Sequence, residues 1–422
     1  MSGADLFDRL SNAGAVVTPA ASAASTVLVG HAPEWLVEPT SLHQLGAVVR
    51  ILDDSGIPWR VDSRGRNWGY DDARLRTPGV IVRLARLDRL SLDVELGLAT
   101  VQPGVTFAKL KEALTEAGAR FYLPPPGSGP HTSVLGNALD RGLLSGLGER
   151  ERHCRDFLVM ERDGSLHRPG WTGAEDARVR GALPYPPGPH GQGALFQTAG
   201  YGPVVVELTH VLQVATAQAM RLVVLSGPVL TEELVRCWRE LLLEGLVSGS
   251  LLAPQARRRA QGTAIAHDGL VLDLSVTAGS VATLRAKAAD VQRVVRQHGQ
   301  RLALRVSEHP DDLRILGGDG ERPEEVAQLA SGLEWHTAAL PFAPSMIVAF
   351  AKAVQAEATL ADTPWSLRPL DDRAVVWLSP FVYRKDDPAD IERLRRRSAA
   401  FDRIRGEFHL PTYRSGGARG GR

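Results

Sequence analysis

The chain contains little cysteine and almost no net charge, and both shortages narrow the range of functions. Only two of the 422 residues are cysteine, Cys154 and Cys237, and neither belongs to a C-x-x-C pair. A disulfide framework, a zinc knuckle and dithiol chemistry are therefore not expected. The formal net charge is +1, so the excess of Lys and Arg that binds nucleic acids or anionic membranes is missing. A small molecule is the more natural ligand.

Long hydrophobic runs and targeting signals are missing too. No stretch approaches the roughly 20 uninterrupted apolar residues of a membrane span. The first residues, MSGADLFDRLSNAGAVV, carry acids where a signal peptide would carry positive charge, and Pro19 interrupts the apolar stretch that follows. We therefore expect a cytoplasmic protein. The sequence also shows no metal-ligand spacing, no G-x-S-x-G and no Walker loop.

The composition is that of a folded protein with more than one core. Hydrophobic residues make up 44% of the chain and charged residues 23%, and a chain of this length normally divides into two domains. Changes in sequence pattern predict a first domain over residues 34–213 and a second over 214–405. An N-terminal segment, residues 1–33, and a short C-terminal return segment and tail, residues 406–422, flank them.

The first domain alternates strand and helix patterns. Residues 35–60 follow a strand, helix, strand pattern, and residues 80–105 predict three short strands. A helix over 106–118 begins at a Thr cap and ends at Gly. The β-branched run 204–211 predicts the strand that completes the domain.

The second domain has the pattern of an α+β unit. Residues 214–246 are apolar at helical spacing, which predicts helix, and 281–298 and 388–405 predict two further helices. Strands are expected at 270–276 and 373–383. Helices that pack on one face of a sheet are typical of this class.

The segment SRGRNWGYD, residues 63–71, follows a predicted strand and suits an anion. Gly65 and Gly69 allow tight turns that bring backbone N–H groups together, and Arg64 and Arg66 add positive charge. A cofactor pyrophosphate would fit such a loop, although a plain turn after a strand has the same pattern. The spacing is not G-x-G-x-x-G, so a Rossmann domain is not predicted.

A Pro/Gly-rich stretch, FYLPPPGSGP at 121–130, predicts a shaped loop, and SVLGNALDRG at 133–142 follows it. Small residues in the second segment permit close approach of the backbone to a ligand, and one amide could bind it. These residues are Ser133, Gly136, Asn137 and Gly142. The same segment could simply begin a helix.

Four segments in this order resemble the FAD-binding domain of the vanillyl-alcohol oxidase and p-cresol methylhydroxylase family. They are RGRNWGY at 64–70, TVQPGVTFAKL at 100–110, SVLGNALDRG at 133–142 and ALFQTAGYGPVVVEL at 194–208. The resemblance implies an α+β fold in which a two-lobed PCMH-type domain holds FAD and an α+β cap domain closes over the flavin ring. It also implies an FAD-dependent oxidoreductase.

The resemblance implies a set of cofactor contacts. The loop after the strand would wrap the pyrophosphate, the SVLGN segment would pass along the flavin, and the last segment would touch the ribityl or adenine portion. The implied residues are Arg64, Gly65, Arg66, Asn67, Trp68, Gly69, Pro103, Gly104, Ser133, Val134, Gly136, Asn137, Gly142, Gly202 and Val204. Pro203 departs from the family's usual Ile or Val and removes a backbone donor.

Phenol-oxidising members of the family hold the substrate phenolate with two tyrosines and one arginine, and the matching residues here are Tyr70, Tyr413 and Arg414. A guanidinium and phenolic O–H donors favour the phenolate, whose electron-rich ring releases hydride from its benzylic carbon to flavin N5. The resemblance thus implies oxidation of a phenolic or similar electron-rich small molecule. Alternatives are a non-phenolic biosynthetic intermediate, a flavin-binding subunit without turnover, or, for the Tyr-Arg pair, an exposed position beside the C-terminal tail.

Two departures from the family concern catalysis and the cofactor linkage. Ser128 stands where members such as vanillyl-alcohol oxidase carry a catalytic aspartate, and His131 could supply the missing base. The histidine that tethers the flavin in some members would fall at Ala339, while His336 is three residues away and is expected to be structural. Noncovalent FAD is therefore expected.

The third departure concerns the end of the chain. Members of the family normally continue well past the Tyr-Arg pair into a segment that covers the cofactor, whereas this sequence continues only to Arg422. The resemblance then implies a more open flavin, or one shielded by a partner chain such as a second copy.

Overall fold

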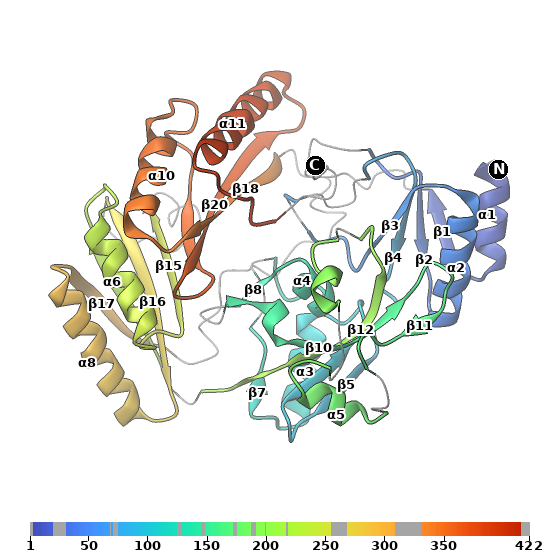
Figure 1. The fold of residues 1–422 in the computed structure, drawn as a ribbon, viewed down its shortest axis with the longest axis horizontal. Coiled ribbons are helices and arrows are strands. Elements are labelled where there is room, and N and C mark those ends of the chain that lie inside the picture. The colour runs from blue at the N-terminus through green and yellow to red at the C-terminus, as the bar shows by residue number, and fades with distance from the viewer. Residues whose placement is uncertain are drawn as a thin grey trace.

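The computed structural model of the chain describes residues 3–19, 31–67, 69–70, 75–124, 126, 128–144, 148–171, 175–186, 191–198, 200–216, 218–254, 268–308 and 331–414. Two smaller sheets form one half of the molecule and a seven-stranded sheet forms the other (Figure 1). The first half has the two lobes expected of the first domain, and we call the large sheet the cap sheet.

The first lobe is a four-stranded sheet with helices packed against it. Its strands, in the order β1-β2-β4-β3, are β1 (Val16–Pro19), β2 (Trp35–Glu38), β4 (Val80–Arg83) and β3 (Trp59–Asp62). Helix α2 (Leu42–Ser55) is capped by Ser41 and ends at Gly56, whose φ of 68° is left-handed. Because α1 (Gly3–Asn12) and β1 pack into this core, part of the N-terminal segment belongs to the first lobe.

The second lobe is an antiparallel five-stranded sheet. Its order β11-β10-β12-β6-β5 joins β11 (Leu166–His167), β10 (Cys154–Met160), β12 (Val204–Val211), β6 (Leu98–Val101) and β5 (Leu90–Asp93). The lobe also includes α3 (Phe107–Glu116), α4 (Val134–Leu139), α5 (Ala177–Ala182) and the short pairs β7 (Phe121–Tyr122) with β13 (Gln213–Val214) and β8 (Leu143–Leu144) with β9 (Gly148–Glu149). Thr106 caps α3 by accepting a hydrogen bond from Lys109 N, as the sequence predicts.

The cap sheet has the order β17-β14-β16-β15-β19-β20-β18. Its strands are β14 (Gln218–Ser226), β15 (Gly249–Pro254), β16 (Leu270–Ala278), β17 (Arg301–Glu308), β18 (Ser331–Pro341), β19 (Ser366–Pro369) and β20 (Ala374–Arg384). One face is covered by α6 (Glu232–Leu243), α8 (Val281–Gln297), α10 (Pro344–Ala356) and α11 (Pro388–Glu407), as Figure 1 shows. The other face is directed toward the two lobes.

One predicted element of the cap is wrong. Residues 218–226 form strand β14 and not the beginning of a helix, and only 232–243 of that stretch is helical. Strand β14 lies between β16 and β17, and its Leu222, Val223 and Val224 are all buried. A short continuous apolar run fits a buried strand and a buried helix equally, so the neighbouring strands decide its conformation. The other strands and helices predicted for this region are confirmed within a few residues.

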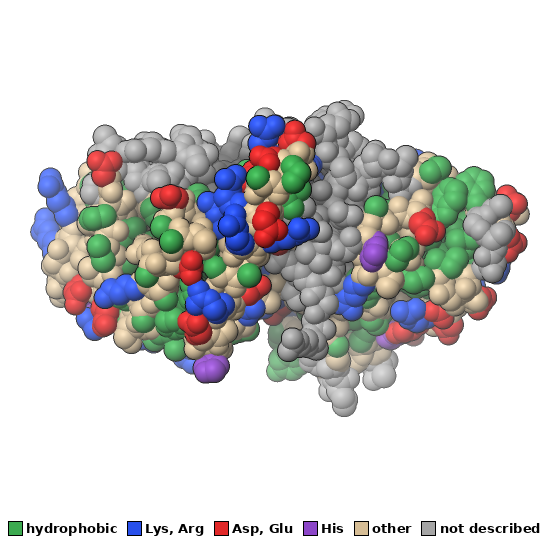
Figure 2. All heavy atoms as spheres, turned by 90° about the horizontal axis from the view of Figure 1, so that it is seen from above, with side chains coloured by type: hydrophobic (Ala, Val, Ile, Leu, Met, Phe, Trp, Pro, Cys, Tyr) green, Lys and Arg blue, Asp and Glu red, His purple; other side chains and the backbone are tan. Residues whose placement is uncertain are grey.

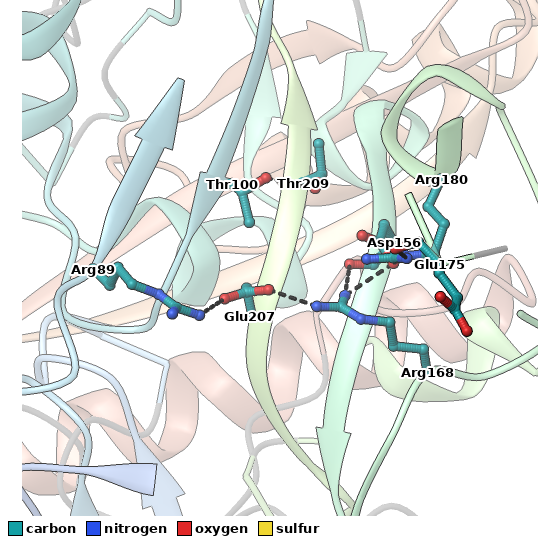
Figure 3. Close-up of polar contacts among 8 residues, drawn as sticks. All are labelled: Arg89, Thr100, Asp156, Arg168, Glu175, Arg180, Glu207 and Thr209. Atoms are coloured by element: carbon teal, nitrogen blue, oxygen red, sulfur yellow. Dashed lines mark hydrogen bonds and ion pairs between the residues drawn. The ribbon is translucent and has the colours of Figure 1, made fainter. Parts of the chain in front are cut away.

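A buried charge network ties β10 to β12 in the second lobe (Figure 3). Glu207 accepts hydrogen bonds from Arg89 Nη2 at 2.6 Å and Arg168 Nη2 at 2.8 Å. Asp156 accepts from Arg168 Nη1 and Arg180 Nε, both at 2.9 Å. Asp156 is only 2% exposed, so each of its ion pairs is shielded from water.

We predict that Asp156→Asn destabilises the protein much more than Asp53→Asn. The first change removes one partner of the buried Asp156–Arg180 ion pair, which costs about 3–5 kcal/mol, whereas the Asp53–Arg162 pair is exposed and contributes about 1 kcal/mol or less. Urea unfolding of parent and both variants measures the difference. Equal losses in the two variants would contradict a structural role for the network.

Candidate functional site

The loop that follows β3 can only be made with glycine at two positions. Gly65 and Gly69 have φ angles of 63° and 79°. A Cβ on Gly65 would lie 2.6 Å from Arg83 Nη2, and a Cβ on Gly69 would lie 2.6 Å from Trp335 Cδ1. The loop therefore passes tightly between the first lobe and cap strand β18.

The two arginines of this loop reach the neighbouring loops. Arg64 Nη1 donates to the carbonyl oxygen of Gly104 at 3.3 Å, and Arg66 Nη2 donates to that of Ser128 at 3.4 Å. The carbonyl oxygen of Asn67 accepts from the backbone N of Tyr70 at 3.2 Å, which closes the turn. Trp68, predicted in the same loop, lies outside the described residues. The structure thus brings two of the predicted cofactor segments together and places the Pro/Gly-rich loop beside them.

Ser133 joins the predicted SVLGN segment to the segment around Pro103. Its Oγ donates to the carbonyl oxygen of Pro103 at 2.6 Å and accepts from the backbone N of Gly136 at 2.9 Å, so it also caps α4. The backbone N of Val134 donates to the carbonyl oxygen of Val105 at 2.9 Å. These bonds hold the start of α4 against the turn after β6.

Three glycines allow the segments around this turn to pack closely against one another. A Cβ on Gly104 would lie 2.2 Å from the carbonyl oxygen of Ala85, and one on Gly136 would lie 2.6 Å from Ser63 Oγ. A Cβ on Gly142 would lie 2.0 Å from Asn137 Oδ1. That Asn137 oxygen is buried and, within the part of the chain that the structure describes, has no hydrogen-bond partner. An unpaired polar oxygen beside such closely packed backbone fits contact with a polar cofactor such as FAD.

The last predicted segment has a different geometry. A Cβ on Gly202 would lie 2.8 Å from Thr198 Cγ2, so this glycine too is closely packed. Val204 is buried in the core of the first lobe, and its backbone pairs with Met160 in strand β10. Any contact of Val204 with a cofactor would therefore have to come from its backbone.

Tyr70, Tyr413 and Arg414 converge, as the resemblance implies. The Cζ atom of Arg414 lies 4.7 Å from the ring centroid of Tyr70 and 5.9 Å from that of Tyr413. Tyr413 is only 2% exposed, so the alternative of an exposed Tyr-Arg pair is wrong. The tail from 415 to 422 lies outside the described residues.

Arg141 connects this cluster to the cofactor segments, and sequence reasoning missed it. Its carbonyl oxygen accepts from Tyr413 Oη at 2.6 Å and from Arg414 Nη2 at 3.1 Å, and its own Nη1 donates to the carbonyl oxygen of Tyr413 at 2.9 Å. Arg141 has a φ of 52°, an uncommon value for a residue other than glycine. Its guanidinium also pairs with Glu149. Its position inside SVLGNALDRG could have pointed to the cofactor segments, but the sequence alone indicates only an ordinary helical arginine.

The cluster is built to keep its donors protonated. Burial lowers the pKa of Arg414, but the nearby Tyr70 and Asp140 raise it by more, so the net pKa lies above the ordinary value. Burial also raises the pKa of Tyr413 well above that of a free tyrosine. At neutral pH Arg414 is a cation and Tyr413 a neutral O–H donor.

The inner face of strand β18 completes the cluster. Trp335 stacks on Tyr70 with ring centroids 6.4 Å apart and planes 16° from parallel, and its backbone N donates to the carbonyl oxygen of Gly69 at 2.9 Å. Thr337 Oγ1 accepts from the backbone N of Tyr413 at 3.1 Å. The alternating pattern of SGLEWHTAALP could have predicted this strand, but not its partners.

The other two residues predicted to be catalytic, Ser128 and His131, belong to the Pro/Gly-rich loop and the turn that follows it. Ser128 shares a 2.8 Å hydrogen bond with the hydroxyl of Thr132, and its carbonyl oxygen accepts from the same hydroxyl at 3.0 Å. His131 is exposed. The structure does not bring His131 into the contacts that join Tyr70, Tyr413 and Arg414, so its role as a base stays a prediction.

His336 and Ala339 lie on opposite faces of β18. His336 is buried on the helix side, where it stacks on Phe381 at 4.2 Å and shares a 3.0 Å hydrogen bond with Ser398 Oγ. Burial lowers its pKa to about 4, so it is neutral in the core. Ala339 lies on the inner face with Trp335 and Thr337, because side chains alternate along a strand. His336 is therefore structural, as expected.

Residues 33–170 match the protein family described as FAD binding domain. The chain thus contains an FAD-binding domain, and with its two lobes and cap it has the architecture of a PCMH-type flavoprotein. It is similar to a solved structure of p-cresol methylhydroxylase with substrate bound, with a TM-score of 0.82, 17% identity and coverage of 99% of this chain and 89% of that chain. A 4-ethylphenol oxidase from Gulosibacter chungangensis gives a TM-score of 0.80, 15% identity and coverage of 99% and 90%.

Two curated relatives match part of the chain. The 1'-carboxy-chondrochloren decarboxylase of Chondromyces crocatus is 34% identical over 38% of this chain and 31% of its own length. The flavoprotein subunit of 4-cresol dehydrogenase (hydroxylating) from Pseudomonas putida is 30% identical over 41% of this chain and 33% of its own length. The match thus spans about a third of each relative.

Surface charge, membrane-spanning helices and metal-binding groups are further indicators of function. Figure 2 shows acidic and basic side chains intermingled on the face that it presents, over both halves of the molecule. Among the residues that the structure describes, no helix is long and apolar enough to cross a membrane. The same residues contain no group of three or more His, Cys, Asp or Glu side chains placed to hold a metal ion.

We predict that Gly136→Leu lowers FAD affinity at least about tenfold, because the new side chain fills the space beside Ser63 along the proposed cofactor path. Gly279→Leu is the matched control, since a Cβ there meets nothing within 4 Å. Titration of apoprotein with FAD, followed by flavin fluorescence, measures affinity, and circular dichroism checks folding. A folded Gly136→Leu protein with parental affinity would show that α4 does not line the cofactor.

Proposed function

We propose that this chain is an FAD-dependent oxidoreductase that acts on a phenolic or similar electron-rich small molecule. The observation that carries the proposal is the position of Arg414 beside the rings of Tyr70 and Tyr413, where the loop after β3 meets the cap sheet. Its Nε atom is buried and, among the described residues, has no hydrogen-bond acceptor. A buried cation with an unused donor suits a phenolate oxygen.

The residues of the cluster support distinct roles. Arg414 holds the phenolic oxygen in its ionised form, because a buried guanidinium favours the nearby anion. Tyr413 donates to Arg141 in the structure, so we assign it first to positioning Arg414 and only second to the substrate. Trp335 stacks on Tyr70 and shields that side of the site from water. FAD, when bound, supplies the two-electron acceptor.

The comparisons support the substrate class. Two of the similar proteins are named for phenols, 4-cresol and 4-ethylphenol, and a third for decarboxylation of a carboxylated compound. Membership of the vanillyl-alcohol oxidase group, a cytoplasmic location and shielding of the flavin by a partner chain remain predictions from the sequence.

We also propose that FAD is held without a covalent bond to β18. Ala339 has no nucleophilic atom, and His336 points into the helix-covered core on the opposite face. We predict that acid precipitation releases all flavin into the supernatant. Flavin fluorescence that stays with the denatured chain on a gel would contradict this.

A second prediction concerns the phenolate site. Arg414→Ala should weaken binding of 4-nitrophenol to the FAD-loaded protein at least about tenfold, since a charge-assisted hydrogen bond contributes about 1.5–3 kcal/mol. Tyr70→Phe should lose less, because a neutral hydrogen bond contributes about 0.5–1.5 kcal/mol. Absorbance difference spectra measure both affinity and ionisation, since the phenolate of this ligand absorbs at longer wavelength than the phenol.

The control for this experiment is Arg395→Ala, which removes an exposed arginine of α11. It should leave ligand binding unchanged. Flavin reduction by 4-ethylphenol, followed without oxygen in the same proteins, should fall in the same order. Parental affinity and parental reduction rates in both Arg414→Ala and Tyr70→Phe would show that these two residues do not hold the phenol.

A further inference from the structure

Arg368 is a cap-sheet residue on the face that looks toward the two lobes. It lies in β19, where its backbone pairs with Val376 while the preceding Leu367 pairs with Trp377. Leu367 and Trp377 are part of the helix-covered core, so Arg368 and Val376 lie on the opposite face. Val376 packs against Tyr413. Arg368 therefore borders the proposed phenol site.

Arg368 is largely covered by protein and lies near Tyr70. Burial lowers the pKa of its guanidinium, while the nearby Tyr70 raises it. The side chain nevertheless remains partly accessible to solvent, as Tyr70 and Arg414 do. Tyr70 is the shared neighbour of Arg368 and Arg414.

Arg368 differs from its basic neighbours because their side chains already bond to carboxylate or carbonyl oxygens of the protein. Arg141 pairs with Glu149, and Arg414 donates to the carbonyl oxygen of Arg141. Arg150 donates to the carbonyl oxygen of Pro124. In the part of the chain that the structure describes, the side chain of Arg368 has neither a hydrogen bond nor an ion pair. An enclosed guanidinium without an anion is costly, so a protein keeps one where a ligand supplies the anion.

We propose that Arg368 binds a carboxylate of the substrate, so that the site selects phenols with an anionic side chain over neutral alkylphenols. The inference rests on the proposed function, in which Arg414 holds the phenolic oxygen. Arg414 comes from the C-terminal segment and Arg368 from β19, so the two guanidiniums meet the ligand from different elements and hold different groups. A guanidinium fork matches a carboxylate with two parallel hydrogen bonds, which makes it selective as well as attractive.

The test compares an acid with its neutral counterpart. The FAD-loaded protein is titrated with 4-hydroxyphenylacetate and with 4-hydroxyphenylacetamide, which share the phenol and differ mainly in charge. We expect the acid to bind at least about tenfold more tightly. Equal binding of the two in the parent protein overturns the proposal without any variant, while the phenol function would stand. If none of the three compounds, the acid, the amide and 4-ethylphenol, binds, both the carboxylate proposal and the proposed phenol function are overturned.

Three variants assign the preference to the residue. Arg368→Gln should lower the acid-to-amide ratio to near one and leave amide binding unchanged, and Arg368→Lys should keep part of the ratio because it keeps the charge. Arg373→Gln removes an arginine immediately before β20 whose side chain is 83% exposed, and it should keep the acid-to-amide ratio of the parent protein. The FAD dissociation constant is measured for each protein.

The competing role for Arg368 is a contact with FAD itself. In that case Arg368→Gln would weaken FAD binding and lower the affinity for acid and amide equally, which would overturn the proposal. An unchanged acid-to-amide ratio in a folded Arg368→Gln protein would overturn it as well. If Arg368→Gln does not fold, Arg368→Lys and the comparison in the parent protein still decide.

Discussion

The carbonyl oxygen of Arg141 is the point on which the proposed site depends. It accepts hydrogen bonds from Tyr413 and Arg414, residues more than 270 positions later in the chain. A left-handed backbone at Arg141 directs this oxygen toward the C-terminal segment, and its guanidinium returns a bond to Tyr413. One residue in the second lobe thus fixes the orientation of the cation that would hold the substrate. Strand β18 holds the same segment from the other side, because Thr337 Oγ1 accepts from the backbone N of Tyr413.

The cap sheet contributes through the difference between its two faces. Its outer face is a conventional core, in which neutral His336 packs among aromatic rings under the helices. Its inner face presents Trp335, Thr337 and Arg368 to the lobes, where a hydrophobic surface would have sufficed for packing alone. The period of two along a strand is what allows one element to serve both purposes. Trp335 and Thr337 contact Tyr70 and Tyr413, whereas the side chain of Arg368 has no such partner among the described residues.

Much of the FAD-binding half could be predicted because its signals are local. The Gly turns after β3, the Thr cap of α3 and the β-branched run of β12 each specify a conformation through their own neighbours. In the cap, strand β14 was predicted as part of a helix, because a short apolar run has no period of its own. Val204 was expected at the cofactor, yet its side chain lies in the core of the first lobe, and spacing in a motif does not reveal which way a side chain points.

The sequence by itself determined the cofactor domain, the residue types of the proposed phenol site and the presence of alanine, not histidine, at position 339. It could do so because glycine requirements, caps and the order of motifs are properties of short segments. Only the tertiary structure decided that Arg141 joins the two ends of the chain, that Tyr413 is buried and that Arg368 borders the site without a partner among the described residues. Those facts depend on strand register and on contacts between residues far apart in the chain, and no local pattern encodes which distant groups will meet.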